Sequence, residues 1–169
     1  MAKVYPFKGK GGHRMTTVFD VANYFLKAVD RDSGSSITHL KLQKLVYYAQ
    51  AWHLVFTSKP IFKARIEAWL HGPVCPELYA QFAGKGYDSL PEPDVPSKSF
   101  SSKELETLEA VWDFYGDYDG KYLEGLTHQE KPWREARKGF SPSDHCTNEI
   151  SLTTMREYYT ELQKNAEKN

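Results

Sequence analysis

The histidine and cysteine side chains of this 169-residue chain are its first candidates for metal binding or nucleophilic catalysis. The histidines are His13, His39, His53, His71, His128 and His145, and the cysteines are Cys75 and Cys146. A zinc site needs such ligands in closely spaced pairs, as in HExxH or a Cys pair facing a His pair. His71 and Cys75 are four residues apart, but a Gly-Pro turn lies between them. We therefore expect no metal ion and no other cofactor.

Covalent catalysis has equally little support in the sequence. Cys75 or Cys146 would act as a nucleophile only with a histidine nearby in space, and we interpret both as buried, inert thiols. The segment GKGG at residues 9–12 lacks the length and the terminal Lys-Ser/Thr of a phosphate-binding loop. The chain also has no GxSxG motif. We therefore expect a protein that is not an enzyme.

Two glutamates keep an enzyme alternative open. Glu67 and Glu130 lie among aromatic residues, where desolvation raises the pKa of an unpaired carboxyl group. A small hydrolase could use Glu67, His53, His71 or His128, the glutamate and histidines of the signature blocks. We favour a structural role, in which Glu67 bonds backbone or a histidine and pins a strand.

The composition indicates one compact cytoplasmic domain. The 22 basic and 22 acidic residues cancel, which gives no overall attraction for nucleic acid or an anionic membrane. Mean hydropathy is -0.61 although 14% of the residues are aromatic. The sequence contains no secretory signal and no apolar run of the roughly 18 residues that cross a membrane.

These residues must be positioned mainly by helices. Thr17 and Asp20 predict a capped helix start, followed by an apolar stripe that ends near the turn at 32–36. Thr38 predicts the start of a second helix, apolar around most of its circumference and therefore buried, which ends at 58–60. Alternating apolar and polar residues over 62–68 predict a short strand with a polar face, and 71–74 a turn.

The second half of the chain continues the helical pattern. Pro76 opens a helix and 84–99 is a loop. Ser101 caps a helix whose expected buried residues are Leu105, Leu108, Val111, Trp112 and Tyr115. Short helices follow at 120–128 and from Pro132. Ser151 caps the last helix, whose expected buried residues are Leu152, Met155, Tyr158, Tyr159 and Leu162.

The predicted fold class is mainly α, a single compact helical domain with a short strand or hairpin element near residues 61–70. Residues 1–16 form a flexible basic N-terminal arm, 17–163 the domain, and 164–169 a frayed C-terminal tail.

Three blocks of sequence, at 40–62, 66–82 and 123–137, together resemble the Panacea domain, also called the SocA-like antitoxin domain. The first contains Leu-Gln-Lys-Leu, Tyr-Tyr and Ala-Gln, the second Ala-Trp and Gly-Pro-Val, and the third Leu-Thr-His ahead of Pro-Trp. We expect the matching residues to be core or structural: Leu42, Gln43, Lys44, Leu45, Tyr47, Tyr48, Trp52, His53, Glu67, Trp69, Gly72, Pro73, Val74, Tyr79, Leu126, Thr127, His128, Pro132 and Trp133.

The resemblance implies an antitoxin of a bacterial or phage toxin–antitoxin system, such as mobile genetic elements carry. Such a protein neutralises a cognate protein toxin, encoded by an adjacent gene, by direct binding. An alternative from the same family is an adaptor that delivers the toxin to a ClpXP-type protease. Many relatives add a helix-turn-helix domain, which we expect to be absent here, so DNA is an unexpected partner. The sequence leaves a homo-oligomer open.

The partner-binding surface is predicted only in outline. The candidate residues are Tyr47, His53, Trp69, His71, Tyr79 and His128. Exposed helix faces, the 84–99 loop and the basic arm are the other places where we expect partner specificity. A nucleic-acid-binding accessory role for the arm is a third functional alternative, which the zero net charge weakens.

Overall fold

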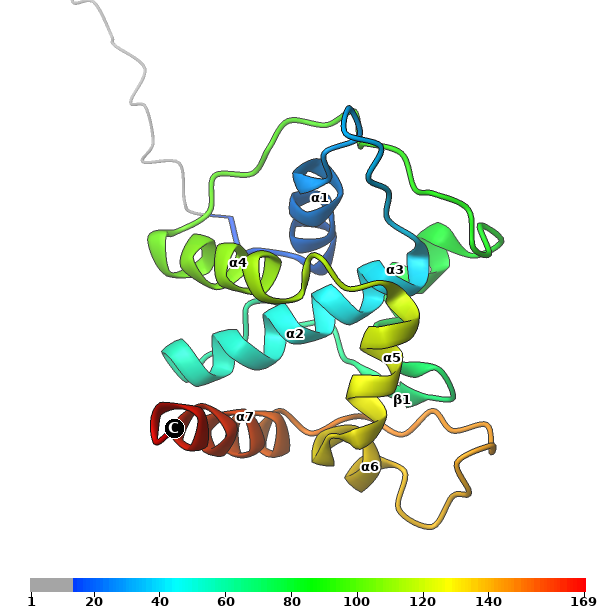
Figure 1. Ribbon diagram of the computed structural model, residues 1–169, viewed down its shortest axis with the longest axis vertical. Helices are drawn as coiled ribbons and strands as arrows, with labels where there is room; N and C mark the ends of the chain where they lie inside the picture. Colours follow the sequence, from blue (N-terminus) through cyan, green and yellow to red (C-terminus); the bar gives the residue numbers. More distant parts are fainter. Residues whose placement is uncertain (1–13) are drawn as a thin grey trace, which may run out of the picture.

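The computed structural model describes residues 14–169, so most of the predicted basic arm, residues 1–13, lies outside the described part. Its elements are α1 (Val18–Ala28), α2 (His39–Thr57), β1 (Glu67–Trp69), β2 (Gly72–Val74), α3 (Pro76–Phe82), α4 (Ser102–Tyr115), α5 (Gly120–Gln129), α6 (Lys131–Ala136) and α7 (Leu152–Glu167). The fold is mainly α with one small hairpin (Figure 1). The predicted fold class is confirmed.

Helix α2 is the centre of the molecule. It packs against α1, α3, α4, α5, α7 and β2, and Figure 1 shows α4 and α7 on opposite sides of it with α5 crossing near one end. Residues 42–51 of α2 are all buried, polar ones included. A helix that is apolar around most of its circumference gains most when neighbours cover every face. The prediction of a buried second helix is confirmed.

The helix starts follow local capping chemistry. Thr17 and Asp20 form a capping box at α1, and Ser101 and Glu104 form a second one at α4. Thr38 Oγ1 accepts a hydrogen bond from the backbone N of Lys41 at the start of α2. These short-range bonds satisfy amide groups that the first helical turn leaves free, and all three starts were predicted.

The hairpin differs from the prediction in extent. β1 pairs antiparallel with β2 in the register Glu67 to Val74, Ala68 to Pro73 and Trp69 to Gly72. Residues 62–66, which we predicted to be strand, have no regular structure, and 72–74 of the predicted turn is the second strand. The turn is confined to Leu70 and His71 because Gly72, with φ of 100°, reverses the chain within two residues.

The predicted polar face of the first strand is also wrong at Glu67, which is buried. The outer edge of this strand is covered by the segment before α7. The backbone N of Ala68 donates to Asn148 O, and that of Ile150 donates to Ile66 O, at 2.8 Å each. A segment about 80 residues away thus encloses a side chain that alternation alone places in solvent.

Three leucines predicted to be buried are exposed: Leu105, Leu152 and Leu162. Helix α4 buries a face centred on Leu108, Val111 and Tyr115, and Leu105 lies at its edge. Helix α7 buries only Met155 and Tyr159, so its other apolar residues flank a narrow contact. Helix α7 also continues to Glu167, into the segment that we expected to fray.

Candidate functional site

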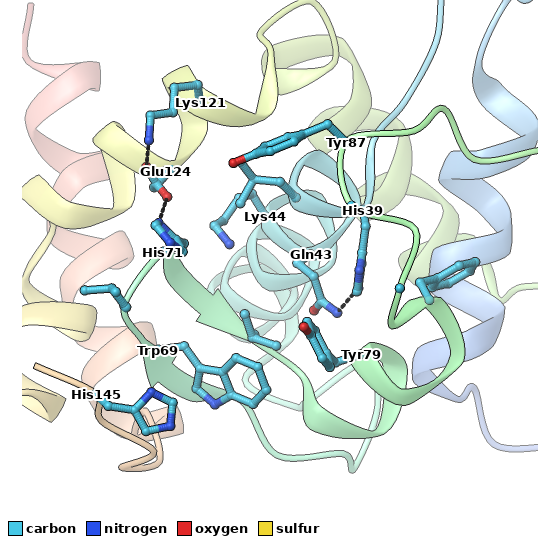
Figure 2. Close-up of a pocket in the computed structure, with 16 residues that line it drawn as sticks. His39, Gln43, Lys44, Trp69, His71, Tyr79, Tyr87, Lys121, Glu124 and His145 are labelled. Atoms are coloured by element: carbon cyan, nitrogen blue, oxygen red, sulfur yellow. Dashed lines mark hydrogen bonds and ion pairs between the residues drawn. The ribbon is translucent and has the colours of Figure 1, made fainter. Parts of the chain in front are cut away.

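A cleft of about 500 Å³ lies between the first half of α2, the hairpin, α3 and the loop that follows α3 (Figure 2). Five residues of the predicted signature line it: Gln43, Lys44, Trp69, Val74 and Tyr79. The first two sequence blocks therefore meet at one concave surface, which makes it the candidate functional site.

Two side chains of α2 hold the second strand of the hairpin against the helix. Gln43 Oε1 accepts a hydrogen bond from the backbone N of Cys75 at 3.0 Å. Lys44 Nζ donates to the carbonyl O of Pro73 at 3.1 Å. Both side chains are buried, where a lost partner costs the full desolvation of the group left behind. The Gln-Lys pair therefore fixes the position of the hairpin.

The third sequence block holds the first strand from the other side. Trp133 Nε1 donates to the carbonyl O of Trp69 at 2.8 Å, and Arg137 donates to that of Ala68 at 2.8 Å. The Arg137 guanidinium lies 4.8 Å from the Trp133 ring centroid, and the His128 ring stacks on Trp133 at 4.0 Å. All three blocks thus converge on the backbone of one hairpin, which supplies a physical reason for their residue types.

Lys44 brings an amine to the floor of the cleft. Burial lowers its pKa to about 7, although the negative charge of Glu124 opposes the shift. A Cβ atom on Gly72 would lie 2.6 Å from Lys44 Cε, so only glycine permits this approach. Near neutral pH the amine is divided between its charged and neutral forms.

Three polar side chains, His71, Glu124 and Lys121, are linked in a row across the rim of the cleft. His71 Nδ1 and Lys121 Nζ each lie 2.7 Å from an oxygen of Glu124 (Figure 2). Desolvation acts to raise the pKa of Glu124, but the hydrogen bonds and charges of Lys121 and His71 outweigh it and lower that pKa overall. Glu124 is therefore an ionised carboxylate that joins the hairpin turn to α5.

His39 completes the wall next to α3. Burial, aided by the Lys44 charge, lowers its pKa to about 4, so the ring is neutral at pH 7. The Gln43 amide N lies 3.0 Å from His39 Nε2. Because that amide N can only donate, we assign the ring proton to Nδ1. The ring also lies against Tyr79, with centroids 5.0 Å apart, so His39 helps to orient a predicted partner-binding aromatic.

The six predicted partner-binding residues separate into three sets. Trp69, His71 and Tyr79 line the cleft together, and the Trp69 and Tyr79 rings are 4.9 Å apart. His128 is half-buried beneath Trp133.

Tyr47 and His53 lie in the interior, which corrects their assignment to a binding surface. They are only 1% and 5% exposed. The Tyr47 hydroxyl lies 3.0 Å from that of Tyr159, and His53 Nδ1 lies 2.8 Å from Thr107 Oγ1. Because neighbouring elements pack on every side of α2, the polar atoms of both side chains are hydrogen-bonded inside the protein.

Glu67 and Glu130 each have two side-chain partners, of different kinds. Glu67 accepts a hydrogen bond from Trp69 Nε1 at 2.8 Å and forms an ion pair with Arg65. We had expected a backbone or histidine partner, so that expectation is wrong. Glu130 accepts from Tyr48 and Tyr159 at 2.6 and 2.9 Å. Desolvation raises the pKa of Glu130 to about 7 against the effect of these hydrogen bonds.

The hydrolase alternative named Glu67, His53, His71 and His128 as candidate residues. His71 is bonded to Glu124, and His53 to Thr107. Glu67 itself is bonded to Trp69 and Arg65.

Other expectations about the site concern metals, thiols and membranes. Within residues 14–169, no three His, Cys, Asp or Glu side chains gather in a way that could hold a metal ion. Cys75 and Cys146 are both buried and free, as predicted, and burial raises the pKa of the Cys75 thiol. No helix in the described range is long and apolar enough to cross a membrane.

Several residues of the cleft were not among the predicted site residues, including His39, Tyr87, Lys121 and Glu124. Lys121 and Glu124 are three apart on a helix, a spacing typical of a surface ion pair. Their link to His71 spans 53 residues and needs the fold. Tyr87 belongs to the 84–99 loop, which we did name as a place of partner specificity, and it is 89% exposed.

Comparison with known proteins gives two matches and one negative result. The model of the family described as "Antitoxin SocA-like, Panacea domain" matches residues 42–134, which is more than half of the chain. The chain is also similar to Antitoxin SocA of Caulobacter vibrioides (strain NA1000 / CB15N), with 42% identity over 50 residues. That alignment spans 30% of this chain and 27% of the relative. No solved structure matches.

Proposed function

The chain belongs to the antitoxin SocA-like, Panacea domain family, and on this premise we propose that it is an antitoxin that neutralises a protein toxin by binding it directly. The observation that carries the proposal is the family match over residues 42–134, which includes most of α2, the hairpin, α5 and most of α6. The proposed partner is the product of an adjacent gene, bacterial or phage, and the proposed site of action is the cytoplasm.

The cleft is the proposed face for the toxin. It offers exposed aromatic surface at Tyr87 and Tyr79, beside the polar side chain of His71. Tyrosine and tryptophan are the usual anchors of protein interfaces because each combines large apolar area with a polar group. The hairpin is bonded on both sides before any partner arrives, and a preorganised surface loses little entropy on binding.

Co-expression tests the proposed function. The chain is produced with the product of each neighbouring reading frame, and growth and co-elution on a sizing column are measured. We expect one neighbour to arrest growth alone, and to be harmless and co-elute when this chain is present. A folded chain that neither rescues growth nor co-elutes with any toxic neighbour would refute the proposal.

The abundance of the toxin separates binding from delivery. Stable toxin during rescue is the result expected of direct neutralisation. Toxin that disappears in cells with ClpXP, and persists in cells without it, would replace direct neutralisation by the adaptor alternative.

Paired substitutions test the cleft itself. Tyr87→Ala should weaken toxin binding because it removes an exposed anchor at the cleft. Phe140→Ala is the matched control, since Phe140 is an exposed aromatic that does not line the cleft. Equal toxin affinity of the Tyr87→Ala protein and wild type would remove Tyr87 from the proposed interface.

A further inference from the structure

The cleft carries more positive than negative charge. Its basic lining residues are Lys44 and Lys121, and the histidines that line it can add only positive charge. Among the described residues that line the cleft, Glu124 is the single carboxylate, and its negative charge acts on both lysines. Two amines therefore share one carboxylate, so positive charge is in excess even while Lys44 is only partly protonated.

Charged residues around the cleft do not cancel this excess. Asp117 and Asp119, which precede α5, act on Lys41 at the start of α2. Lys85 and Asp88 belong to the loop after α3, carry opposite charges and do not line the cleft. The positive charge is therefore a property of the cleft itself.

The polar side of the cleft offers hydrogen-bond donors rather than acceptors. Both oxygens of Glu124 are already bonded, one to His71 and the other to Lys121. The Lys121 side chain is 78% exposed, and its ammonium has further N–H groups to donate. Within the described part of the chain, the hydroxyls of Tyr79 and Tyr87 have no hydrogen-bond partner. A group that enters the cleft therefore meets donors that need an acceptor.

The remainder of the cleft is aromatic. Figure 2 shows the Tyr87 hydroxyl on the side of Lys121 and Glu124, whereas Trp69 and Tyr79 form the wall near the hairpin. The Trp69 and Tyr79 rings are 4.9 Å apart. A cleft of about 500 Å³ has the size that holds a drug-sized ligand, which corresponds to a few side chains of a partner.

We propose that the cleft binds an acidic segment of a partner protein, with an aspartate or glutamate carboxylate beside Lys121 and a neighbouring apolar side chain against Trp69. A carboxylate is negatively charged and only accepts hydrogen bonds. It therefore complements both the excess positive charge and the unused donors. The inference rests on the proposed antitoxin function for the identity of that partner, the toxin, and adds the chemistry of the toxin segment that the cleft takes.

Peptide pools test this chemistry without the toxin. Each pool holds end-blocked pentapeptides with one fixed central residue and mixed residues elsewhere, and an array of the pools is incubated with the labelled full chain. We expect the Asp and Glu pools to retain at least about threefold more protein than the Asn and Gln pools, and the Lys and Arg pools to retain least, because like charges repel. Equal retention by acidic and basic pools, stronger retention by basic pools, or retention by none would overturn the proposal.

Charge reversal locates the binding. Lys121→Glu should lower retention by the acidic pools at least about threefold. Lys103→Glu is the matched control, because Lys103 is also an exposed lysine paired with a glutamate three residues later, but it lies on α4 outside the cleft. Lys121→Ala replaces the first variant if circular dichroism shows that it does not fold. A folded Lys121 variant with the acidic preference of the control would overturn the site.

Glu124→Gln should have the opposite effect. The substitution removes the negative charge of the cleft, so the acidic pools should retain about twofold or more additional protein. Lower retention by a folded Glu124→Gln protein would mean that the occupant recognises the Glu124 carboxylate itself, and it would overturn the proposal of an acidic occupant.

Growth rescue keeps this proposal distinct from the proposed function. If wild type neutralises a toxin but shows no preference for acidic pools, this proposal fails and the antitoxin function stands. If wild type neutralises no toxin, the antitoxin function fails, and the pools still decide whether the cleft takes an acidic segment. With a neutralised toxin in hand, we expect Lys121→Glu to weaken its binding more than Lys103→Glu does, and equal effects would count against the cleft.

Discussion

Lys44 is an amine enclosed by protein. Its ammonium donates to the Pro73 carbonyl, and its side chain is fully buried. Burial of a charge that lacks a close counter-ion disfavours the protonated form. The folded protein therefore binds fewer protons at this position than the unfolded chain does, over the range between the folded pKa of about 7 and the ordinary value of 10.5.

Substitution of Lys44 should change how stability depends on pH. The unfolded state binds the extra proton, so the Lys44 contribution to the free energy of unfolding rises as pH increases from 7 to 10.5. Lys44→Met removes this term, which amounts to roughly 3–5 kcal/mol across the full range. We expect wild type to gain stability relative to Lys44→Met when urea unfolding is measured at pH 7 and at pH 9.5. A constant difference between the two proteins would show that the amine titrates normally.

Glu130 shows the opposite behaviour. Its pKa is raised to about 7 from 4.5, so the folded state holds the proton that the unfolded state releases. The Glu130 contribution is complete below pH 4.5 and is lost as pH rises toward 7. Glu130→Gln keeps an oxygen to accept from Tyr48 and Tyr159 without a charge.

We expect the Glu130→Gln protein to gain about 1–3 kcal/mol of stability relative to wild type between pH 5 and pH 8. Thermal or urea unfolding at both pH values measures the gain. No relative change over the same interval would mean that Glu130 is already ionised in the folded protein at pH 5.

The geometry of the hairpin depends on contacts that are distant in sequence. Gly72 has φ of 100°, and an added Cβ would also lie 2.9 Å from Thr127 Oγ1. Gly34 has φ of 86° with no atom within 4 Å of an added Cβ. The pair separates backbone strain from steric overlap.

Gly34→Ala should cost about 1–2 kcal/mol through strain alone. Gly72→Ala should cost roughly 1–3 kcal/mol more, because Lys44 and Thr127 must move. Chemical denaturation of both variants measures the difference. Equal losses would show that the hairpin moves away from α2 without cost.

The same elements show what the sequence could and could not predict. Helix starts at Thr17, Thr38 and Ser101 were predictable because each cap bonds within three residues. The second strand was missed because Gln43 and Lys44 hold it from about 30 residues away. Helical periodicity identified apolar stripes, but it did not determine how wide a stripe the neighbours cover.

The candidate site was likewise predictable only in part, because contacts between distant segments were not visible in the sequence. The family resemblance brought Trp69, His71 and Tyr79 forward as partner-binding residues, and the fold places them in one cleft. It also brought forward Tyr47, which packing on all sides of α2 encloses. Glu124 and Lys121 had only an ordinary i, i+3 spacing in the sequence.

At the scale of the whole molecule, α2 connects two concave surfaces. The cleft uses His39, Gln43 and Lys44 near its start, and an apolar groove between α2, α4 and α7 uses Trp52 and Phe56 near its end. A helix of 19 residues is about 28 Å long. The two surfaces are thus separate in space but share one rigid element, and the stability of that element determines the shape of both.

Amide hydrogen exchange should therefore be slowest in the middle of α2. Five other helices and the hairpin pack against it, and residues 42–51 are buried without interruption. Amides there should open only with global unfolding. Helix α7 is the internal comparison, since it is helical over 16 residues but buries only Met155 and Tyr159. We expect its last two turns to exchange at least about a hundredfold faster than residues 45–51, as measured by NMR at one pH. Protection in α7 equal to that in α2 would mean that the molecule unfolds as a single unit, in which α2 is no more stable than the helices around it.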